Sequence, residues 1–255
     1  GGEPLLSPKF GDLLKGIMEL GLQDVSLTTN GQLLPRYADD IIASGMKRIN
    51  VSLDTLNRDA FRDIARSGDL NTVLHGIELM QAGDLKVKIN MVPMRGVNDD
   101  QIIPLLEYSL ERGIELRFIE LMNMGHLQAS PVHGQQFYSM EEILECISGR
   151  YAFSRTDAPF DSTAVRYEIP AHGTFGIIAN ESEPFCKTCT RLRLSSNGDL
   201  YGCLSNARSQ SIRDLLPLSD EQAIPQLEAI LLSALGDKQS DNFSGEVTVM
   251  KFIGG

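Results

Sequence analysis

Short apolar runs alternate with longer amphipathic stretches through the first half of the chain. The runs predict strands at residues 25–29, 49–53, 87–92 and 116–121. The amphipathic stretches predict helices at residues 8–20, 35–43, 72–81 and 99–112. Strands separated by helices are typical of βα units and a parallel sheet. An antiparallel sheet with one solvated face would explain the pattern within each strand equally well, but the intervening helices favour the parallel arrangement.

Each predicted strand has one polar and one apolar face. The polar positions are Ser26, Thr28, Asn30, Asn50, Ser52, Asp54, Lys86, Lys88, Asn90, Glu115 and Arg117. In a packed parallel barrel both faces of a strand would be largely apolar. We therefore expect a barrel whose interior is a polar ligand chamber and whose apolar face contacts outer helices.

The regular alternation of predicted strands and helices ends after Met122. The pattern then predicts a loop at residues 125–136, a helix that begins at Ser139, and strands at residues 164–169 and 174–179. Two further helices are predicted to begin at Ser211 and Ser219.

Composition narrows the class of protein. The 255 residues carry a formal net charge of −11, which argues against general binding to nucleic acid or to an anionic membrane. A phosphate ligand would therefore need a local cationic pocket. The sequence has no apolar run of eighteen residues and no signal-peptide pattern. These features predict a cytoplasmic protein, in a compartment where free thiols and iron-sulfur clusters persist.

Residues that could bind a metal or a ligand are most concentrated in the segment 185–204, FCKTCTRLRLSSNGDLYGCL. Cys186 and Cys189 form a C-x2-C pair, and Cys203 follows after thirteen intervening residues. Arg191 and Arg193 alternate with leucines as in a strand, and the sequence SNGD supplies a turn. The segment predicts a hairpin that returns Cys203 to the C-x2-C pair and aims two guanidinium groups beside it.

Three thiolates in this spacing suit a [4Fe-4S] cluster with one open iron, next to an anionic substrate. The alternative is a structural zinc site, which normally needs a fourth ligand such as His172 or Cys146. A disulfide is less consistent with the sequence, because no even, secreted cysteine framework surrounds the pair.

Gly1-Gly2-Glu3-Pro4 opens the chain as a loop in which the backbone can approach a ligand closely. Because the chain starts with glycine inside this motif, we expect a preceding segment.

The residues together resemble a known family. The opening GGEP, the segments SLTTNG, INVSLD, KVKIN and RFIELM, the cysteine hairpin and the terminal GG are similar to the GTP 3',8-cyclases. These are radical S-adenosylmethionine enzymes that open molybdenum-cofactor biosynthesis. The resemblance covers essentially the whole chain. It implies an α/β fold with a partial TIM-type barrel at residues 1–125, followed at residues 126–255 by a cluster- and substrate-binding region.

The resemblance also implies roles for individual residues. The S-adenosylmethionine site would comprise Gly2, Glu3, Ser52 and Met122. The GTP site would comprise Thr28, Lys88, Arg117, Arg191 and Arg193. A [4Fe-4S] cluster would be held by Cys186, Cys189 and Cys203. The terminal Gly254-Gly255 would reach into the active site.

In the family mechanism, a first cluster on a C-x3-C-x2-C loop cleaves S-adenosylmethionine. The resulting 5'-deoxyadenosyl radical removes hydrogen from C3' of GTP, and the C3' radical attacks C8 of guanine to give 3',8-cyclo-7,8-dihydro-GTP. A downstream cyclic pyranopterin monophosphate synthase takes the product, and a homodimer is one arrangement the resemblance allows.

The sequence departs from the family in one respect. It contains no C-x3-C-x2-C motif, since Cys146 is the only cysteine outside the hairpin. We therefore expect the ligands of this radical-generating cluster, a second [4Fe-4S] cluster besides the one on the hairpin, to lie outside this sequence, and the chain as written to be inactive. Two alternatives are a radical S-adenosylmethionine peptide-modifying enzyme with an auxiliary cluster and a non-catalytic, metal-stabilised binding module. A third, an ordinary barrel enzyme without a cluster, is disfavoured by the cysteine hairpin.

Overall fold

The computed structural model describes residues 2–128, 130–159 and 162–238. Its α-helices are α1 (Phe10–Glu19), α2 (Leu34–Ala43), α3 (Arg58–Ala65), α4 (Leu70–Ala82), α5 (Ile102–Glu111), α6 (Val132–Gln136), α7 (Met140–Ser148) and α8 (Asp220–Gly236). Its strands are β1 (Ser26–Thr29), β2 (Arg48–Ser52), β3 (Lys86–Met91), β4 (Glu115–Ile119), β5 (Ser154–Thr156), β6 (Val165–Ile169), β7 (Gly173–Ile178), β8 (Arg193–Leu194), β9 (Asp199–Tyr201) and β10 (Ser209–Ser211). Short 3-10 helices are η1 (Pro4–Leu6), η2 (Asp99–Gln101), η3 (Gly125–Leu127), η4 (Cys186–Thr188) and η5 (Arg213–Leu215).

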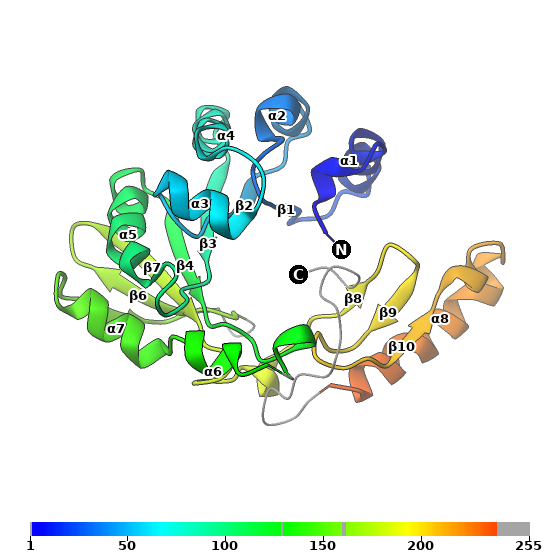
Figure 1. The fold of residues 1–255 in the computed structure, drawn as a ribbon. Helices are drawn as coiled ribbons and strands as arrows, with labels where there is room; N and C mark the ends of the chain where they lie inside the picture. The colour runs from blue at the N-terminus through cyan, green and yellow to red at the C-terminus, as the bar shows by residue number, and fades with distance from the viewer. Residues whose placement is uncertain (1, 129, 160–161, 239–255) are drawn as a thin grey trace.

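The larger sheet is an open, curved half-barrel (Figure 1). Its strand order is β1-β2-β3-β4-β7-β6-β5. The pairs from β1 to β7 are parallel, and β6 and β5 add to β7 in antiparallel order. Within the described residues, β1 and β5 form the two edges, so the sheet does not close. The expectation of an α/β, partial TIM-type barrel is confirmed.

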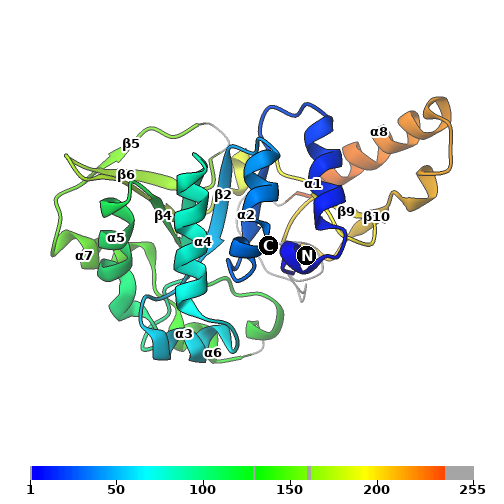
Figure 2. The ribbon, with the colours of Figure 1, turned by 90° about the horizontal axis from the view of Figure 1, so that it is seen from above.

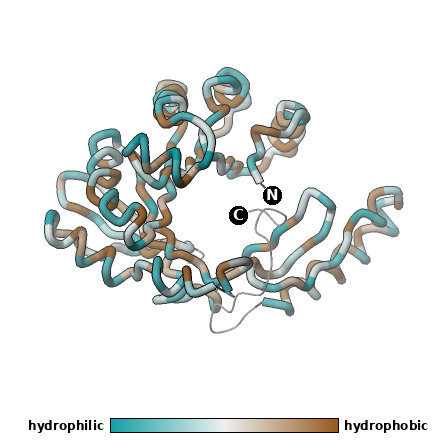
Figure 3. The backbone as a smooth tube through the Cα atoms, viewed as in Figure 1, coloured by the Kyte–Doolittle hydropathy of each residue, from teal (hydrophilic) through white to brown (hydrophobic). Residues whose placement is uncertain are grey.

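Helices cover the convex side of this sheet, and the apolar positions collect where helices and strands meet (Figure 3). Ile49, Val51, Ile89 and Met91 on the strands are fully buried there. Gly76 lets α4 approach α2, because a Cβ at this position would lie 2.6 Å from the Cβ of Leu34. The hydrophobic effect thus fixes the outer face of the sheet and leaves the alternate positions for the concave face.

The strand register places the polar positions in one row. Thr28 of β1 pairs with Asn50 of β2, Asn50 pairs with Lys88 of β3, and Lys88 pairs with Glu115 of β4. Because side chains alternate along each strand, residues in one row point to the same face. The predicted polar face is therefore continuous across four strands.

The structure corrects several predicted elements in the second half of the chain. No helix begins at Ser211, which instead ends β10 and is followed by η5. The predicted loop at 125–136 contains η3 and α6. The strand predicted at 174–179, found as β7, joins the parallel sheet beside β4. Periodicity within a segment does not tell which strand will be its neighbour, and only long-range packing selects this pairing.

Two further elements, α3 and β5, were not predicted. In α3, the side chain of Asn57 caps the helix by accepting from the backbone N–H groups of Asp59 and Ala60. Strand β5 is only three residues long and is defined by its pairing with β6. Such a short segment has too few alternating positions to be recognised from its own sequence.

A second sheet, β10-β9-β8, lies with α8 at the opposite end of the molecule from α5 and α7 (Figure 1, Figure 2). It faces the open side of the half-barrel.

Among the described helices, none is both long enough and apolar enough to cross a membrane. The proposed division at residue 125 stays a prediction, and the seven-stranded sheet draws strands from both sides of it. Gly254 and Gly255 lie outside the described residues.

Candidate functional site

The three cysteines of the hairpin line one cavity. Cys186, Cys189 and Cys203 share it with Arg191 and Arg193. The other lining residues are Met122, Thr163, Asn180, Phe185, Gly202, Leu204 and Lys238. The structure therefore brings together every residue that the hairpin motif singled out.

Local backbone geometry explains how the hairpin returns Cys203 to the C-x2-C pair. Strands β8 and β9 pair through Arg193↔Tyr201 and Leu194↔Leu200. In the turn, the Ser195 hydroxyl accepts from the backbone N–H of Asp199 at 3.0 Å. Strand β8 is shorter than expected, so Arg191 precedes it and is not side by side with Arg193 on a strand.

Helix α8 is packed directly against the hairpin next to Cys203. A Cβ at Gly202 would lie 1.8 Å from the carbonyl oxygen of Ala234, which is closer than any side chain can come. Gly202 is therefore required by a close approach between two backbone segments. This contact fixes the position of the neighbouring Cys203 relative to α8.

Cationic groups surround the Cys189 thiol. The Lys238 ammonium lies 3.8 Å from Sγ of Cys189, and the Arg191 guanidinium lies 3.9 Å from it. Burial opposes ionisation of this thiol, but the backbone N–H of Arg191 and these two charges outweigh burial and lower the pKa of Cys189. Burial, together with the other two thiols, raises the pKa of Cys186. The neighbouring cations thus favour the thiolate form of Cys189 over its thiol form.

The donor set fits an iron-sulfur cube better than zinc. Among the described residues, no group of three His, Cys, Asp or Glu side chains is arranged to hold a single metal ion. The fourth ligands considered for zinc are not there either: His172 packs against Tyr151, and Cys146 packs against the main core. Zinc ligands converge on one ion, whereas the thiolates of a cube each bind a different iron. Three thiols that line one cavity are compatible with the second arrangement.

The opening motif is tied to the end of β1 through Glu3. Its Oε1 accepts from the Thr29 hydroxyl at 2.7 Å, and its Oε2 accepts from the backbone N–H of Asn30 at 2.7 Å. Gly2 has a φ of +73°, a conformation that glycine adopts easily. Glu3 therefore fixes the loop to the sheet through its own carboxylate.

The residues predicted for S-adenosylmethionine occupy two places. Ser52 lines a second cavity with Asn30 and Asp54, and Glu3 contacts Asn30. Burial raises the pKa of Asp54, against the hydrogen bond from Val92 N–H. Met122 lies instead in the cysteine cavity. The structure thus joins Glu3 and Ser52 through Asn30 and places Met122 beside the thiols.

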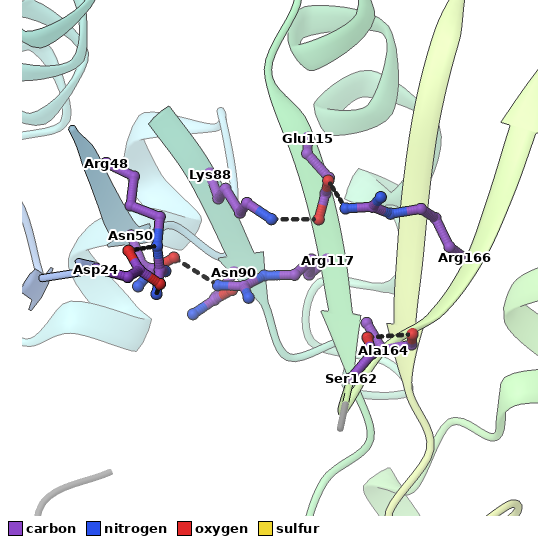
Figure 4. Close-up of polar contacts among 10 residues, drawn as sticks. All are labelled: Asp24, Arg48, Asn50, Lys88, Asn90, Glu115, Arg117, Ser162, Ala164 and Arg166. Carbon is purple, nitrogen blue, oxygen red and sulfur yellow. Dashed lines mark hydrogen bonds and ion pairs between the residues drawn. The ribbon is translucent and has the colours of Figure 1, made fainter. Parts of the chain in front are cut away.

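A hydrogen-bonded row crosses the concave face of the sheet (Figure 4). Arg117 donates to Asn90 Oδ1 at 2.9 Å and to Asn50 Oδ1 at 2.7 Å. Asn50 in turn donates to the Thr28 hydroxyl at 3.2 Å. Burial lowers the pKa of Arg117, yet a guanidinium stays charged in proteins. The predicted Thr28 and Arg117 therefore belong to one network.

Lys88 is ion-paired with Glu115 at 2.9 Å, and Arg166 binds the same carboxylate at 2.7 Å (Figure 4). Sequence reasoning missed both Arg166 and Lys238 as site residues. Arg166 had a weak signal, because it alternates with the small Ala164 on a predicted strand. Lys238 had no such signal in the sequence, because it follows a predicted helix and belongs to no recognisable motif.

Comparison with known proteins agrees with this geometry at the level of the class. Residues 1–109 match the model of the Radical SAM superfamily. The solved structure of Streptococcus suis SuiB bound to S-adenosylmethionine shares the fold, with a TM-score of 0.58 and 19% identity over 86% of this chain and 53% of that one. The fold is that of a radical S-adenosylmethionine protein.

The particular family follows from the rest of the chain. Residues 114–244 match the family Molybdenum Cofactor Synthesis C. A GTP 3',8-cyclase of Synechocystis sp. is 38% identical over 89% of this chain and 69% of its own length. GTP 3',8-cyclase 1 of Pseudomonas aeruginosa is 37% identical over 99% of this chain and 78% of its own. The chain belongs to the GTP 3',8-cyclase family.

Proposed function

We propose that this chain supplies the residues that bind and orient the substrate and S-adenosylmethionine in a GTP 3',8-cyclase, a lyase that converts GTP to 3',8-cyclo-7,8-dihydro-GTP in the first step of molybdenum-cofactor biosynthesis. One observation carries the proposal beyond family membership. Three thiols and two arginines, Cys186, Cys189, Cys203, Arg191 and Arg193, line a single cavity. This is the donor set that a cluster beside an anionic nucleotide requires. The peptide-modifying enzyme and the metal-stabilised module are not favoured.

The three cysteines would hold a [4Fe-4S] cluster. When bound, the cluster would supply an open iron to which the guanine base can attach. Arg191 and Lys238 compensate the negative charge of the Cys189 thiolate, at 3.9 Å and 3.8 Å. The three thiols are partly buried, and this partial burial strengthens their interactions with the cations.

The nucleotide would be bound by cations from two parts of the fold. Arg191 and Arg193 come from the hairpin segment, whereas Lys88 and Arg117 come from adjacent strands of the half-barrel. The Thr28 hydroxyl extends the polar row to β1. Cations on two rigid elements would hold the triphosphate in one orientation, so that C3' and C8 are positioned for ring closure.

S-adenosylmethionine would be bound by Gly2, Glu3, Ser52 and Met122. Glu3 would position the loop backbone, since both of its oxygens already accept hydrogen bonds. This sequence contains four cysteines and no C-x3-C-x2-C motif. Its residues thus provide no ligand set for the radical-generating cluster, and the part assigned to them is binding and orientation of the two small molecules.

The remaining partners follow from the proposed reaction. We place the protein in the cytoplasm, a compartment in which free thiols persist. A cyclic pyranopterin monophosphate synthase would take up the product, and the protein would work without nucleic acid or membrane. A homodimer is part of the proposal, and sedimentation would test it.

The test is a cyclisation assay on the protein that contains this chain, purified and reconstituted anaerobically. With GTP deuterated at C3', S-adenosylmethionine and a reductant, the proposal predicts a GTP isomer and deuterated 5'-deoxyadenosine by mass spectrometry. ATP should yield neither product. Deuterium transfer from ATP, or a GTP isomer without transfer, would contradict the assigned reaction.

A further inference from the structure

The carboxylate of Glu115 bridges two cations that come from different strands. Its Oε1 lies 2.9 Å from Nζ of Lys88 on β3, and its Oε2 lies 2.7 Å from a guanidinium nitrogen of Arg166 on β6 (Figure 4). The Glu115 side chain is only 16% exposed. Each oxygen therefore satisfies one cation in a partly water-excluded position.

Arg166 reaches this carboxylate by crossing a neighbouring strand. The strand order β4-β7-β6 puts β7 between Arg166 and Glu115. The β7 residue opposite Arg166 is Gly176, which is also opposite Arg117 on β4. A Cβ at Gly176 would lie 3.1 Å from the Cβ of Ala164 and 3.4 Å from Cγ of Arg117. The missing side chain therefore leaves room above β7 for the side chain of Arg117, and Arg166 passes over the same strand to reach Glu115.

The resulting cluster has an excess of positive charge. Lys88, Arg166 and Arg117 contribute three cations, and Glu115 contributes one carboxylate. Arg117 donates to neutral amide oxygens of Asn90 and Asn50. A local excess of cations in a chain with a net charge of −11 opposes the overall field and marks a place suited to an anion.

We propose that Arg166 is a further triphosphate-binding residue, and that Glu115 is an internal counter-ion that holds Lys88 and Arg166 in position until the polyphosphate arrives. The inference rests on the proposed function, because it takes a nucleoside triphosphate as the ligand. Arg166 lies on a strand that carries none of the residues assigned above to nucleotide binding.

The Glu115 carboxylate binds one cation at each of its two oxygens, as a phosphate group could also do. The substrate therefore competes with Glu115 for Lys88 and Arg166, and the carboxylate charge repels the incoming phosphate. Glu115 stabilises the ligand-free arrangement and weakens triphosphate binding. Arg166 adds an attraction that guanosine, without phosphates, does not receive.

A purely structural ion pair makes the opposite prediction. If Arg166 only joined β6 to β4, its loss would lower the stability of the sheet and leave the affinity for every ligand unchanged. The Glu115→Gln variant separates the two cases, because the amide keeps the size and one acceptor oxygen while removing the charge.

The experiment measures dissociation constants by calorimetry for GTP, inorganic triphosphate and guanosine, on the anaerobically reconstituted protein. Arg166→Gln should weaken binding of GTP and of inorganic triphosphate about fivefold to tenfold, allowing for the partial exposure of the guanidinium. Glu115→Gln should tighten both about threefold to tenfold. Guanosine should bind all variants alike.

Arg150→Gln is the matched control, since Arg150, in the exposed turn after α7, pairs with Glu107 of α5 at 3.1 Å through the same kind of side chains. It should leave all affinities unchanged. Unchanged triphosphate affinity in Arg166→Gln, or weaker affinity in Glu115→Gln, would overturn the inference. If Glu115→Gln proves unstable, Arg166→Lys and Arg166→Gln still decide the role of Arg166.

The two proposals fail in different ways. If wild type binds GTP and cyclises it but Arg166→Gln does so with equal affinity, the proposed function stands and this inference is wrong. If inorganic triphosphate shows the expected changes while GTP is neither preferred over ATP nor cyclised, the anion site stands and the cyclase function is wrong.

Discussion

The ammonium of Lys238 lies 3.8 Å from Sγ of Cys189 and 3.0 Å from the carbonyl oxygen of Gly202, and it also donates to the carbonyl oxygen of Arg191. It thereby joins the two segments of the hairpin that carry Cys189 and Cys203. The Lys238 side chain thus places a positive charge near the Cys189 thiol and also ties together the segments that carry Cys189 and Cys203.

Replacing Lys238 by Met should disrupt the cavity. Two carbonyl oxygens would lose a charged donor, which corresponds to about 2 kcal/mol of unfolding free energy. We expect a lower iron content after anaerobic reconstitution and a lower melting temperature. Lys15→Met is the control, because Lys15 is exposed on α1. A Lys238→Met protein with wild-type iron content and melting temperature would contradict this role.

The hairpin cysteines should be the ones that hold the cluster. Cys186→Ala, Cys189→Ala and Cys203→Ala should each lose bound iron and sulfide, since a cube with two thiolates is poorly held. Cys146→Ala should keep a full complement, because Cys146 packs against the core of the half-barrel. Iron and sulfide analysis per protein provides the measurement. Retention of both by the triple hairpin variant would rule out the assignment.

Three cations should share the triphosphate. Arg191→Ala, Arg193→Ala and Lys88→Ala should each weaken GTP binding about tenfold to a hundredfold, as expected for loss of one charge-assisted contact. Calorimetric titration with GTP and guanosine should show the loss for GTP alone. Equal affinities for GTP in all three variants and wild type would reject the pocket.

Gly202 should tolerate no side chain. Gly202→Ala would force a Cβ to 1.8 Å from the Ala234 carbonyl oxygen, so the hairpin and α8 must separate. We expect loss of iron together with destabilisation of about 3 kcal/mol or more, as for an overpacked contact. Gly16→Ala in α1 is the control, because a Cβ there meets nothing within 4 Å. That variant should be slightly more stable, and a normal Gly202→Ala protein would show that α8 is not packed there.

Asp54 should make stability depend on pH in an unusual direction. Burial raises its pKa in the folded chain above the unfolded value, so the folded state binds the proton more tightly. Stability contributed by protonated Asp54 is present below the unfolded pKa and is lost as the pH rises through the folded pKa. Each tenfold difference in proton affinity corresponds to about 1.4 kcal/mol.

Urea unfolding between pH 4 and pH 7 checks this prediction with Asp54→Asn. The variant keeps an acceptor for the backbone N–H of Val92, which wild-type Asp54 binds at 2.8 Å. Relative to Asp54→Asn, wild type should lose stability as the pH rises. A constant difference over the whole range would mean that Asp54 has the same pKa in both states.

The sequence alone determined the parts of the fold that depend on local pattern. Alternation within short runs located β1 to β4 and identified Asn50, Lys88 and Arg117 as members of one polar face, because side-chain direction follows from strand geometry. Cysteine spacing and turn residues identified the hairpin. These features depend only on residues close together in the chain, and the structure confirmed the fold and the shared cavity of the three cysteines.

Tertiary structure decided what depends on contacts between distant segments. No local pattern indicates that β7 pairs with β4, that Arg166 reaches Glu115 across β7, or that Lys238 returns to Cys189 from the end of α8. Residues 49 positions apart meet in the last case because helix packing against Gly202 brings them together. Such contacts arise only when the whole chain minimises its exposed apolar area, so they belong to the fold and not to any segment of the sequence.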